Sequence, residues 1–155
     1  MSMSAENTLT TLGITLPVPS APAASYTNAV RWGTLVYLSG KAPLPEGGSL
    51  PRGRLGREFT VDQGRLFARS AALDLIAVLR HELGSLDKVA RIIELQGFVN
   101  ATEDFTSHAA VLDGASDTFF EIFGPIGIHA RSVLGASSLR SGIPLVLRAV
   151  VGTVD

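Results

Sequence analysis

Arg131 is the residue whose type and surroundings first suggest chemistry, because it is a cation at the start of the largely apolar stretch "HARSVLGASSLRSGIPLVLRAVV". An arginine on a strand presents a planar group of hydrogen-bond donors that can bind a carboxylate at two points. A partly buried guanidinium without a partner is strongly destabilising, so we expect an anion beside it. The residues leave two partners open: the carboxylate of a ligand, or a glutamate or aspartate in an intersubunit salt bridge.

Other residue types that carry chemistry are sparse. His81, His108 and His129 lie far apart, no two of them have metal-ligand spacing on a helix, and the sequence contains no cysteine. Ser116 lies in "GASD" within a helical region, and the sequence identifies no base near it, which argues against a nucleophilic serine. Phosphate-binding glycine loops and the GxSxG motif are absent. The sequence therefore predicts neither a metal nor a cofactor.

The composition favours a single domain that binds neither nucleic acid nor a membrane. Of the 155 residues, 46% are hydrophobic and 17% charged, which is enough for one core. A formal net charge of -1 provides no field that would attract a polyanion. No apolar run approaches the roughly 20 residues that cross a bilayer, and no basic segment precedes an apolar one at the start. We therefore expect a cytoplasmic protein.

Two helices are expected to position the chemistry-bearing residues. Thr60 and Gln63 fit a capping box at the start of the first helix, apolar residues then recur at helical spacing, and Gly84 ends it. The second helix is predicted within residues 104–123, where "GP" follows the last apolar residue. Gly114 could divide this second helix into a short turn and a longer helix.

Runs rich in β-branched and aromatic residues predict the strands. A hairpin is expected over residues 28–39, and three further strands are expected over 89–98, 130–136 and 145–151. Gly97 is interpreted as a β-bulge inside the third strand.

Two segments are predicted to lack regular structure. Residues 1–25 are rich in Ser, Thr, Ala and Pro and predict an extended arm before a single domain over residues 26–155. Residues 40–57 predict a long surface loop, which could be either functional or a solvated excursion. This loop contains most of a local basic cluster made of Lys41, Arg52, Arg54 and Arg57.

The predicted order β-β-α-β-α-β-β is typical of an α/β fold in which a sheet carries both helices on one face. The second face of that sheet would stay uncovered, although the strands "LVYLS" and "LVLRAVV" are apolar enough to be buried on both sides. With no further helices predicted, the expected cover is another copy of the chain. We therefore expect a homo-oligomer with clefts between its subunits.

Several segments together resemble the RidA/YjgF family, also labelled L-PSP endoribonucleases. They are "LGITLPVPSAPAASYTNAVRWGTLVYLSGKAPL", "GFVNATEDF", "DGASDTFFEIFG" and "HARSVLG", which span most of the chain from about residue 8. The interval between Phe105 and the pair Phe119 and Phe120 is similar to that of a longer, divergent branch of the family. The resemblance implies a two-layer chorismate-mutase-like α/β fold and a homotrimer with ligand sites in its intersubunit clefts.

The resemblance also implies an activity and a set of site residues. Active members hydrolyse reactive enamines and imines, such as 2-aminoacrylate, to 2-keto acids and ammonia. Arg131 matches the family arginine that binds the substrate carboxylate, and it is the residue assigned a catalytic role. The implied substrate-binding residues are Tyr26, Ser39, Gly40, Asp113, Ala130 and Arg131, with Asp113 replacing a family asparagine. As an anion, Asp113 could itself pair with Arg131.

This sequence departs from the family pattern in its last strand. Archetypal members carry a glutamate there that is thought to position or activate the hydrolytic water, whereas "LVLRA" places Val146 at that position and Arg148 at a second acidic one. Arg140 replaces the usual proline of the preceding turn. Valine cannot exchange a proton, so a general acid or base role there is excluded. Asp113, Ser132 or a residue of the 40–57 loop could position water instead.

The resemblance, weighed against these residues, implies three possible functions. The first is a trimeric enamine/imine deaminase that uses Arg131 to bind a small amino-acid-derived carboxylate, with weak or altered activity because the glutamate is absent. The second is a non-catalytic trimer that binds a small carboxylate metabolite in the same cleft. The third, an endoribonuclease, is disfavoured by the near-neutral charge, the few aromatic residues and the absence of an evident acid/base pair.

Overall fold

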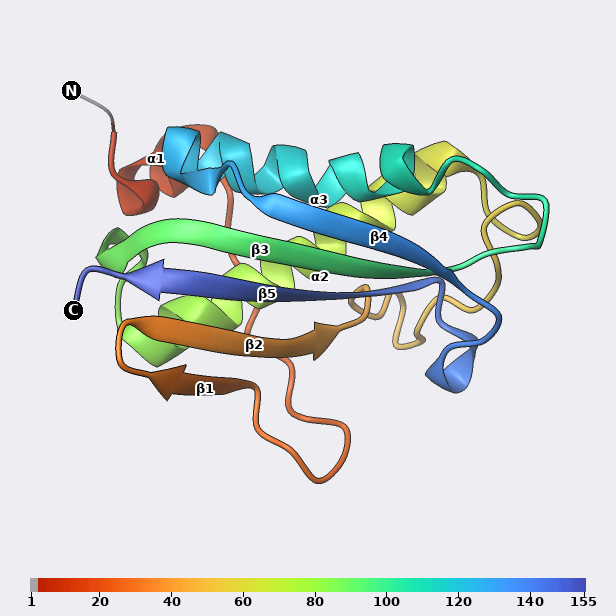
Figure 1. Ribbon diagram of the computed structural model, residues 1–155, viewed down its shortest axis with the longest axis horizontal. Helices are drawn as coiled ribbons and strands as arrows, with labels where there is room; N and C mark the ends of the chain where they lie inside the picture. The colour runs from red at the N-terminus through yellow and green to blue at the C-terminus, as the bar shows by residue number, and fades with distance from the viewer. Residues whose placement is uncertain (1–2) are drawn as a thin grey trace.

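The structure of the protein is a computed structural model that describes residues 3–155 (Figure 1). Its strands are β1 (Ala29–Trp32), β2 (Leu35–Lys41), β3 (Val89–Asn100), β4 (Ala130–Ala136) and β5 (Leu145–Thr153). Its helices are α1 (Ala5–Leu12), α2 (Val61–Leu83) and α3 (His108–Phe123). Short 3-10 turns are η1 (Leu86–Lys88), η2 (Gly124–Gly127) and η3 (Arg140–Gly142). The predicted order β-β-α-β-α-β-β is confirmed, and α1 is added before it.

The strands form one sheet in the order β1-β2-β5-β3-β4. Adjacent strands are antiparallel except β3 and β4, which run parallel and are connected by a crossover through α3. The last strand, β5, lies in the centre, and its residues Leu145 and Leu147 are fully buried. Helices α2 and α3 lie together on one face of the sheet (Figure 1), which confirms the predicted two-layer α/β class.

The boundaries of α2 follow the local signals in the sequence. Thr60 Oγ1 accepts a hydrogen bond from Gln63 N at 3.2 Å, and Gln63 Oε1 accepts one from Thr60 N at 2.9 Å. This reciprocal pair is the predicted capping box. Gly84 follows the helix with a φ of 82°, a left-handed conformation that glycine adopts without a steric penalty.

Close packing of α3 depends on two glycines. A Cβ at Gly97 would lie 2.6 Å from Leu112 Cδ1, so this glycine lets α3 pack directly on β3. The predicted bulge at Gly97 is wrong, because the irregular pairing of β3 with β5 lies before Leu95. A Cβ at Gly114 would lie 2.1 Å from Arg65 O of α2. Helix α3 therefore runs unbroken through Gly114, where its backbone packs directly against that of α2.

Helix α1 lies where the composition predicted an extended arm, so that prediction is wrong for this segment. The Ser4 side chain caps its start, and Gly13 ends it with a φ of 67°. Ala5 and Leu9, one helical turn apart, are its buried residues. Residues 13–28 contain neither helix nor strand, as the composition predicted for the remainder of the arm.

Apolar side chains are exposed on the face of the sheet opposite α2 and α3. The hairpin pairs Val30 with Tyr37 and Trp32 with Leu35 across its two strands. Trp32 is 78% exposed, and Leu134 of β4 is 50% exposed. Exposed apolar side chains that share one face are typical of an interaction face.

Candidate functional site

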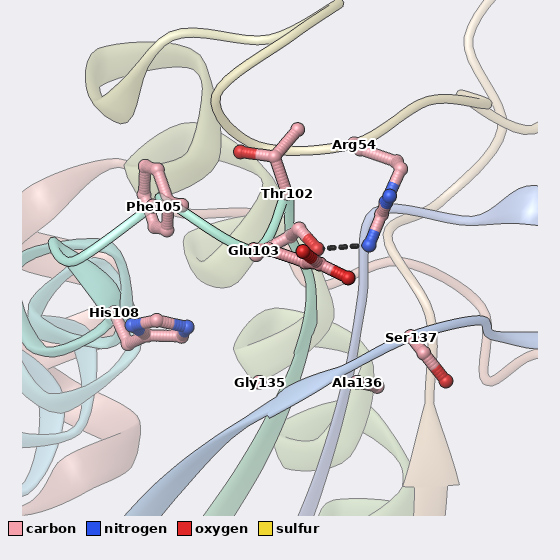
Figure 2. A pocket seen from close by; sticks show the side chains of 9 residues that line it. Arg54, Thr102, Glu103, Phe105, His108, Gly135, Ala136 and Ser137 are labelled. Carbon is pink, nitrogen blue, oxygen red and sulfur yellow. Dashed lines mark hydrogen bonds between the residues drawn. The ribbon is translucent and has the colours of Figure 1, made fainter.

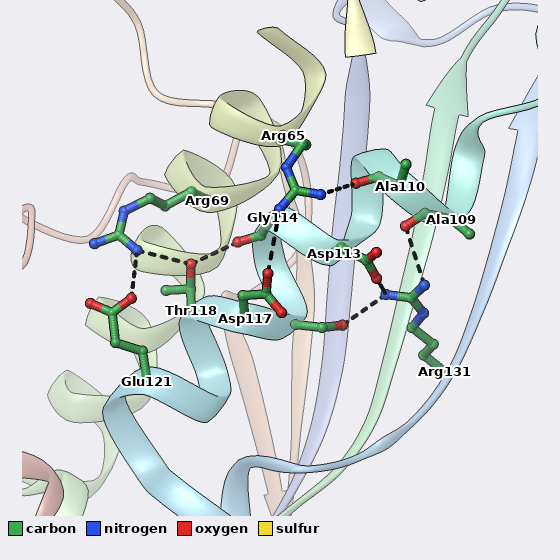
Figure 3. A network of polar contacts seen from close by, with 11 residues as sticks. Arg65, Arg69, Ala109, Ala110, Asp113, Gly114, Asp117, Thr118, Glu121 and Arg131 are labelled. Atoms are coloured by element: carbon green, nitrogen blue, oxygen red, sulfur yellow. Dashed lines mark hydrogen bonds and ion pairs between the residues drawn. The ribbon is translucent and has the colours of Figure 1, made fainter. Parts of the chain in front are cut away.

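Arg131 lies at the start of β4, an edge strand of the sheet, and is paired in register with the buried Leu95 of β3. Its side chain is directed to α3 (Figure 3). Nη1 lies 2.9 Å from Asp113 Oδ1 and donates to Ser116 Oγ at 3.0 Å, while Nη2 donates to Ala109 O at 3.2 Å. Helix α3 of the same chain thus provides the anion that the sequence predicted beside this guanidinium.

The ion pair between Arg131 and Asp113 is accessible to solvent. The Arg131 side chain is 24% exposed and the Asp113 side chain 46%. Ion pairs at such positions contribute about 0–1 kcal/mol to stability, because water and salt screen them. A dissolved carboxylate can therefore compete with Asp113 for the guanidinium without a large loss of folding free energy.

Ser116 and His129 extend this contact into a longer hydrogen-bonded chain. Ser116 Oγ lies 2.9 Å from His129 Nε2, and His129 Nδ1 lies 2.7 Å from Gly127 O in η2. Burial lowers the pKa of His129, and the positive charge of Arg131 acts in the same direction, whereas the hydrogen bond to Gly127 O opposes them. The imidazole is therefore neutral at neutral pH.

Sequence reasoning missed this pair. It recognised Ser116 but found no base nearby, and it treated each histidine separately. The two residues lie 13 positions apart and meet only because η2 turns the chain from the end of α3 back to β4. The backbone carbonyl of Gly127 orients the His129 ring. Every residue has such a carbonyl, so the residue types could not predict this contact.

Three of the other predicted site residues, Tyr26, Ser39 and Gly40, lie at or near strand β2, towards the edge of the sheet opposite β4. Ser39 Oγ donates to Thr27 O at 2.6 Å, and Tyr26 Oη accepts from Ala23 N at 3.1 Å. Tyr26 and Gly40 line a cavity of about 200 Å³. Strands β5 and β3 separate β2 from β4, so one chain does not bring this group to Arg131. Ala130, which opens β4, is exposed and remains beside Arg131.

The position of the missing family glutamate has apolar surroundings. Val146 alternates with the buried Leu145 and Leu147, and it is paired with Phe98 of β3. A Cβ at Gly40 would lie 2.7 Å from Val146 Cγ1, so the valine fills the space above this glycine. The Val146 side chain therefore lies on the face opposite α3, whereas the Arg131 side chain is directed to α3.

A buried charged network anchors the segment that carries Tyr26. Lys41, which the sequence placed in a surface loop, is only 4% exposed, and Asp74 of α2 is 1% exposed. Lys41 Nζ donates to Ser20 O at 2.9 Å, Ser20 Oγ at 2.8 Å and Asn28 Oδ1 at 2.8 Å. Ser20 Oγ donates to Asp74 Oδ2 at 2.6 Å. Because all three ammonium protons are donated, Lys41 is a structural cation.

Arg54 of the basic loop borders a separate pocket of about 330 Å³ (Figure 2), whereas Arg52 and Arg57 line another pocket. Arg54 donates to Asn100 Oδ1 at 3.3 Å and to the carbonyl of Ala101, and Leu55 is fully buried. This part of the loop is thus anchored to the end of β3. The pocket is lined by Arg54, Ala101, Thr102, Glu103, Phe105, His108, Gly135, Ala136 and Ser137. None of the predicted site residues lies among them.

The three histidines do not converge. His81 lies in the last turn of α2, His108 begins α3 and His129 precedes β4. Over residues 3–155, no group of three or more histidine or acidic side chains could hold a metal ion. In the same part of the chain, no helix has both the length and the apolar character needed to cross a membrane.

Known proteins resemble this chain over most of its length. The sequence model of the family described as "YjgF/chorismate_mutase-like, putative endoribonuclease" matches residues 6–147. Protein TCP17 of Trypanosoma cruzi is 38% identical over 141 residues, which cover 90% of this chain and 88% of that protein.

Solved structures agree with the sequence comparison. A protein of unknown function from Agrobacterium tumefaciens has a TM-score of 0.86 at 34% identity, covering 96% of this chain and 92% of that one. A Shewanella oneidensis protein described as "a putative endoribonuclease" has a TM-score of 0.92 at 30% identity, covering 97% and 99%. Both share the chorismate-mutase-like fold that the sequence motifs implied. The chain therefore belongs to the YjgF/chorismate-mutase-like family.

Proposed function

We propose that this protein hydrolyses enamines or imines of small amino-acid-derived carboxylates to 2-keto acids and ammonia. The observation that carries the proposal is the contact of Arg131 Nη1 with a carboxylate oxygen at 2.9 Å. In the free protein that carboxylate belongs to Asp113. In the complex, the carboxylate of the substrate takes its place.

Exchange of the two carboxylates leaves the guanidinium oriented. Arg131 retains its hydrogen bonds to Ser116 Oγ and Ala109 O when Asp113 moves away. Asp113 is itself half exposed, so its side chain can turn into water and remain solvated. A bound substrate thus replaces one ion pair with another and leaves no buried charge unpaired.

The proposed site includes a second copy of the chain, in a homotrimer. Two observations support this part of the proposal. The sheet exposes apolar side chains on the face without helices, and the group formed by Tyr26, Ser39 and Gly40 lies away from Arg131 within one chain. A neighbouring copy placed against the β4 edge supplies that group across the intersubunit cleft.

A second candidate is a protein that binds the same carboxylates without reaction. It is favoured by Val146, whose neighbours Phe98 and Gly40 provide no group that could hold or activate water. An endoribonuclease activity has less support, because the net charge of -1 gives little attraction for RNA.

The test is a coupled assay in which a dehydratase generates 2-aminoacrylate and 2-keto acid release is followed with the protein present. The wild type should release keto acid faster than a blank, and Arg131→Ala should lose at least about tenfold of that acceleration through poorer positioning. Arg65→Ala is the matched control. Arg65 of α2 forms an exposed ion pair with Asp117 of α3, the helix that also carries Asp113. Equal release by the wild type, Arg131→Ala and the blank would contradict the proposal.

Thermal shift separates the two candidates. A 2-keto acid that binds only the folded protein must raise its melting temperature. Binding without acceleration, abolished by Arg131→Ala, would establish the carboxylate-binding function in place of the deaminase.

A further inference from the structure

A continuous chain of hydrogen bonds leads from Arg131 to the backbone of η2. Arg131 Nη1 lies 3.0 Å from Ser116 Oγ, Ser116 Oγ lies 2.9 Å from His129 Nε2, and His129 Nδ1 lies 2.7 Å from Gly127 O. Ser116 comes from α3, Gly127 from η2, Arg131 from β4 and His129 from the link between η2 and β4, so these hydrogen bonds depend on the tertiary fold. Each distance is that of a well-formed hydrogen bond.

The groups at the two ends of this series of hydrogen bonds determine which atom donates in each bond. The carbonyl of Gly127 can only accept, so His129 Nδ1 carries a proton and donates it. In the neutral ring, Nε2 is then an acceptor, and it receives the hydroxyl proton of Ser116. The guanidinium of Arg131 can only donate, and it donates to the same hydroxyl oxygen. Ser116 is thus polarised between a cation and a base.

We propose that Ser116 and His129 are the proton-transfer pair of the Arg131 site and supply the acid/base function that Val146 cannot. This proposal rests on the deaminase function proposed above. Ser116 is the catalytic residue of the pair, because its hydroxyl is next to the bound carboxylate. His129 is a positioning and relay residue that acts through Ser116.

Substrate placement follows from Arg131 Nη1. This one nitrogen contacts both Asp113 Oδ1, at 2.9 Å, and Ser116 Oγ, at 3.0 Å. A substrate carboxylate that replaces Asp113 on Nη1 therefore lies beside the Ser116 hydroxyl. The imine carbon is bonded directly to that carboxylate, which brings the reacting centre and its attacking water close to the same hydroxyl.

The reaction balances with water as the only co-substrate. Water attacks C2 of the protonated imine, a C–O bond forms, and the C=N π pair moves to nitrogen. The released water proton passes to Ser116 Oγ as the serine proton moves to His129 Nε2. The imidazolium returns that proton through Ser116 to the amine, and the C–N bond then breaks. Ammonia leaves with the carbinol proton as ammonium, and the 2-keto acid remains.

The surroundings of His129 keep the ring available as a base. The cation Arg131 of β4 is bonded to Ser116, and Asp113 of α3 is paired with Arg131. Arg91 of β3 donates from Nε to Ile128 O at 3.1 Å, next to the histidine in sequence. The Phe119 ring packs edge-on, 5.8 Å from the imidazole between centroids. Burial together with Arg131 lowers the pKa of His129 below its ordinary 6.5.

Ser116→Ala and His129→Gln test the pair, and His81→Gln, an exposed histidine outside the site, is the control. Each variant is assayed for kcat and KM in the coupled reaction, for its melting-temperature shift with pyruvate, and for the pH dependence of kcat. Both site variants should lose roughly 100-fold in kcat. Both should keep the pyruvate-induced shift of the wild type, because Arg131 is intact. His129→Gln should also abolish the fall of kcat below pH 6.5 that protonation of the base causes.

A purely structural role would leave kcat and its pH profile unchanged once the variants are shown to be folded by their melting curves. If the wild type accelerates keto-acid release and both site variants match it within about threefold, the pair is refuted and the deaminase function stands. If the wild type does not exceed the blank, the deaminase function itself fails, and the catalytic role of the pair fails with it.

Discussion

Asp113 Oδ1 lies 2.9 Å from Arg131 Nη1, so this chain holds a carboxylate of its own at the cation that we propose binds the substrate carboxylate. Both residues come from one chain, one on α3 and the other on β4. The proposed ligand binding at Arg131 is therefore an exchange of carboxylates, and its affinity should depend on how strongly Asp113 competes.

Asp113→Asn should increase the affinity of Arg131 for 2-keto acids, because a neutral amide competes less well for the guanidinium. An accessible ion pair is worth about 0.2–1 kcal/mol, which corresponds to a gain of about 1.4- to fivefold in affinity. Isothermal titration with pyruvate measures the change. Asp117→Asn, on the same helix but paired with Arg65, should bind as the wild type does. An affinity equal to or below that of the wild type would refute the competition.

Asp74→Asn should destabilise the protein strongly, because it removes the buried anion of the network that contains Lys41. A buried cation left without its counter-charge costs about 3 kcal/mol, or a fall of roughly 6–12 °C in melting temperature. Differential scanning calorimetry gives the value. Asp117→Asn serves as the exposed control, with a change below about 1 kcal/mol. Similar losses for the two variants would mean that burial of the charges does not matter.

Gly114→Ala should lower the free energy of unfolding, although alanine normally stabilises a helix interior relative to glycine by about 1 kcal/mol. The new Cβ would lie 2.1 Å from the backbone oxygen of Arg65, so α2 and α3 must separate. Overpacking of this kind costs about 1–3 kcal/mol. Urea denaturation measures the difference.

Gly135→Ala is the matched control for Gly114→Ala. Its Cβ would lie 2.8 Å from His108 Nε2, the end of a side chain that can turn away. We expect a change well below that of Gly114→Ala. Equal effects would show that the close approach of α2 and α3 is not what requires glycine at position 114.

Acidification should destabilise the wild type through His129. The pKa of this residue in the folded protein is lowered from 6.5, so the unfolded chain binds the proton more tightly. The contribution of neutral His129 to the free energy of unfolding is therefore complete above pH 6.5 and is lost as the pH falls towards the folded-state pKa. Chemical denaturation across this range should show a flatter pH dependence for His129→Gln than for the wild type. His81→Gln should follow the wild type.

Tyr37→Glu should dissociate the proposed homotrimer, because Tyr37 lies 44% exposed on the sheet face without helices. A carboxylate there would have to be desolvated in the interface. Light scattering after gel filtration should give three times 16.3 kDa for the wild type and a lower mass for the variant. Leu66→Glu changes an exposed leucine of α2 and should leave the mass unaltered. A wild type that is monomeric would refute the assembly.

Local signals predicted most of the fold. The capping box of Thr60 and Gln63, the glycine at 84 and the apolar runs around Gly33 each act within a few residues, so one sequence is enough to recognise them. Helix α1 escaped prediction because it is short and buries only Ala5 and Leu9, which give no extended periodicity. Its capping serine and terminal glycine were the signals available.

The candidate site was less predictable, because its contacts join distant parts of the chain. Arg131 and Asp113 could be proposed as partners from motif resemblance alone. The contact between Ser116 and His129 depends on the turn in η2 and on the parallel register of β4 with β3, which residue types do not encode. Burial of Lys41 was missed for the same reason, since its acceptors Ser20 and Asn28 lie in a segment without regular structure.

The Lys41 network should also determine how fast the backbone amides near Ser20 exchange their hydrogens with solvent. Segments without helix or strand usually exchange their amide hydrogens quickly, through small local fluctuations. Here the amide of Ser20 donates to Asp74 Oδ1 at 3.1 Å. Lys41 would lose its three hydrogen bonds if this segment detached from the domain. The Ser20 amide should therefore exchange as slowly as the core of α2. Residues 13–28 would then unfold cooperatively with the rest of the domain, although they contain neither helix nor strand.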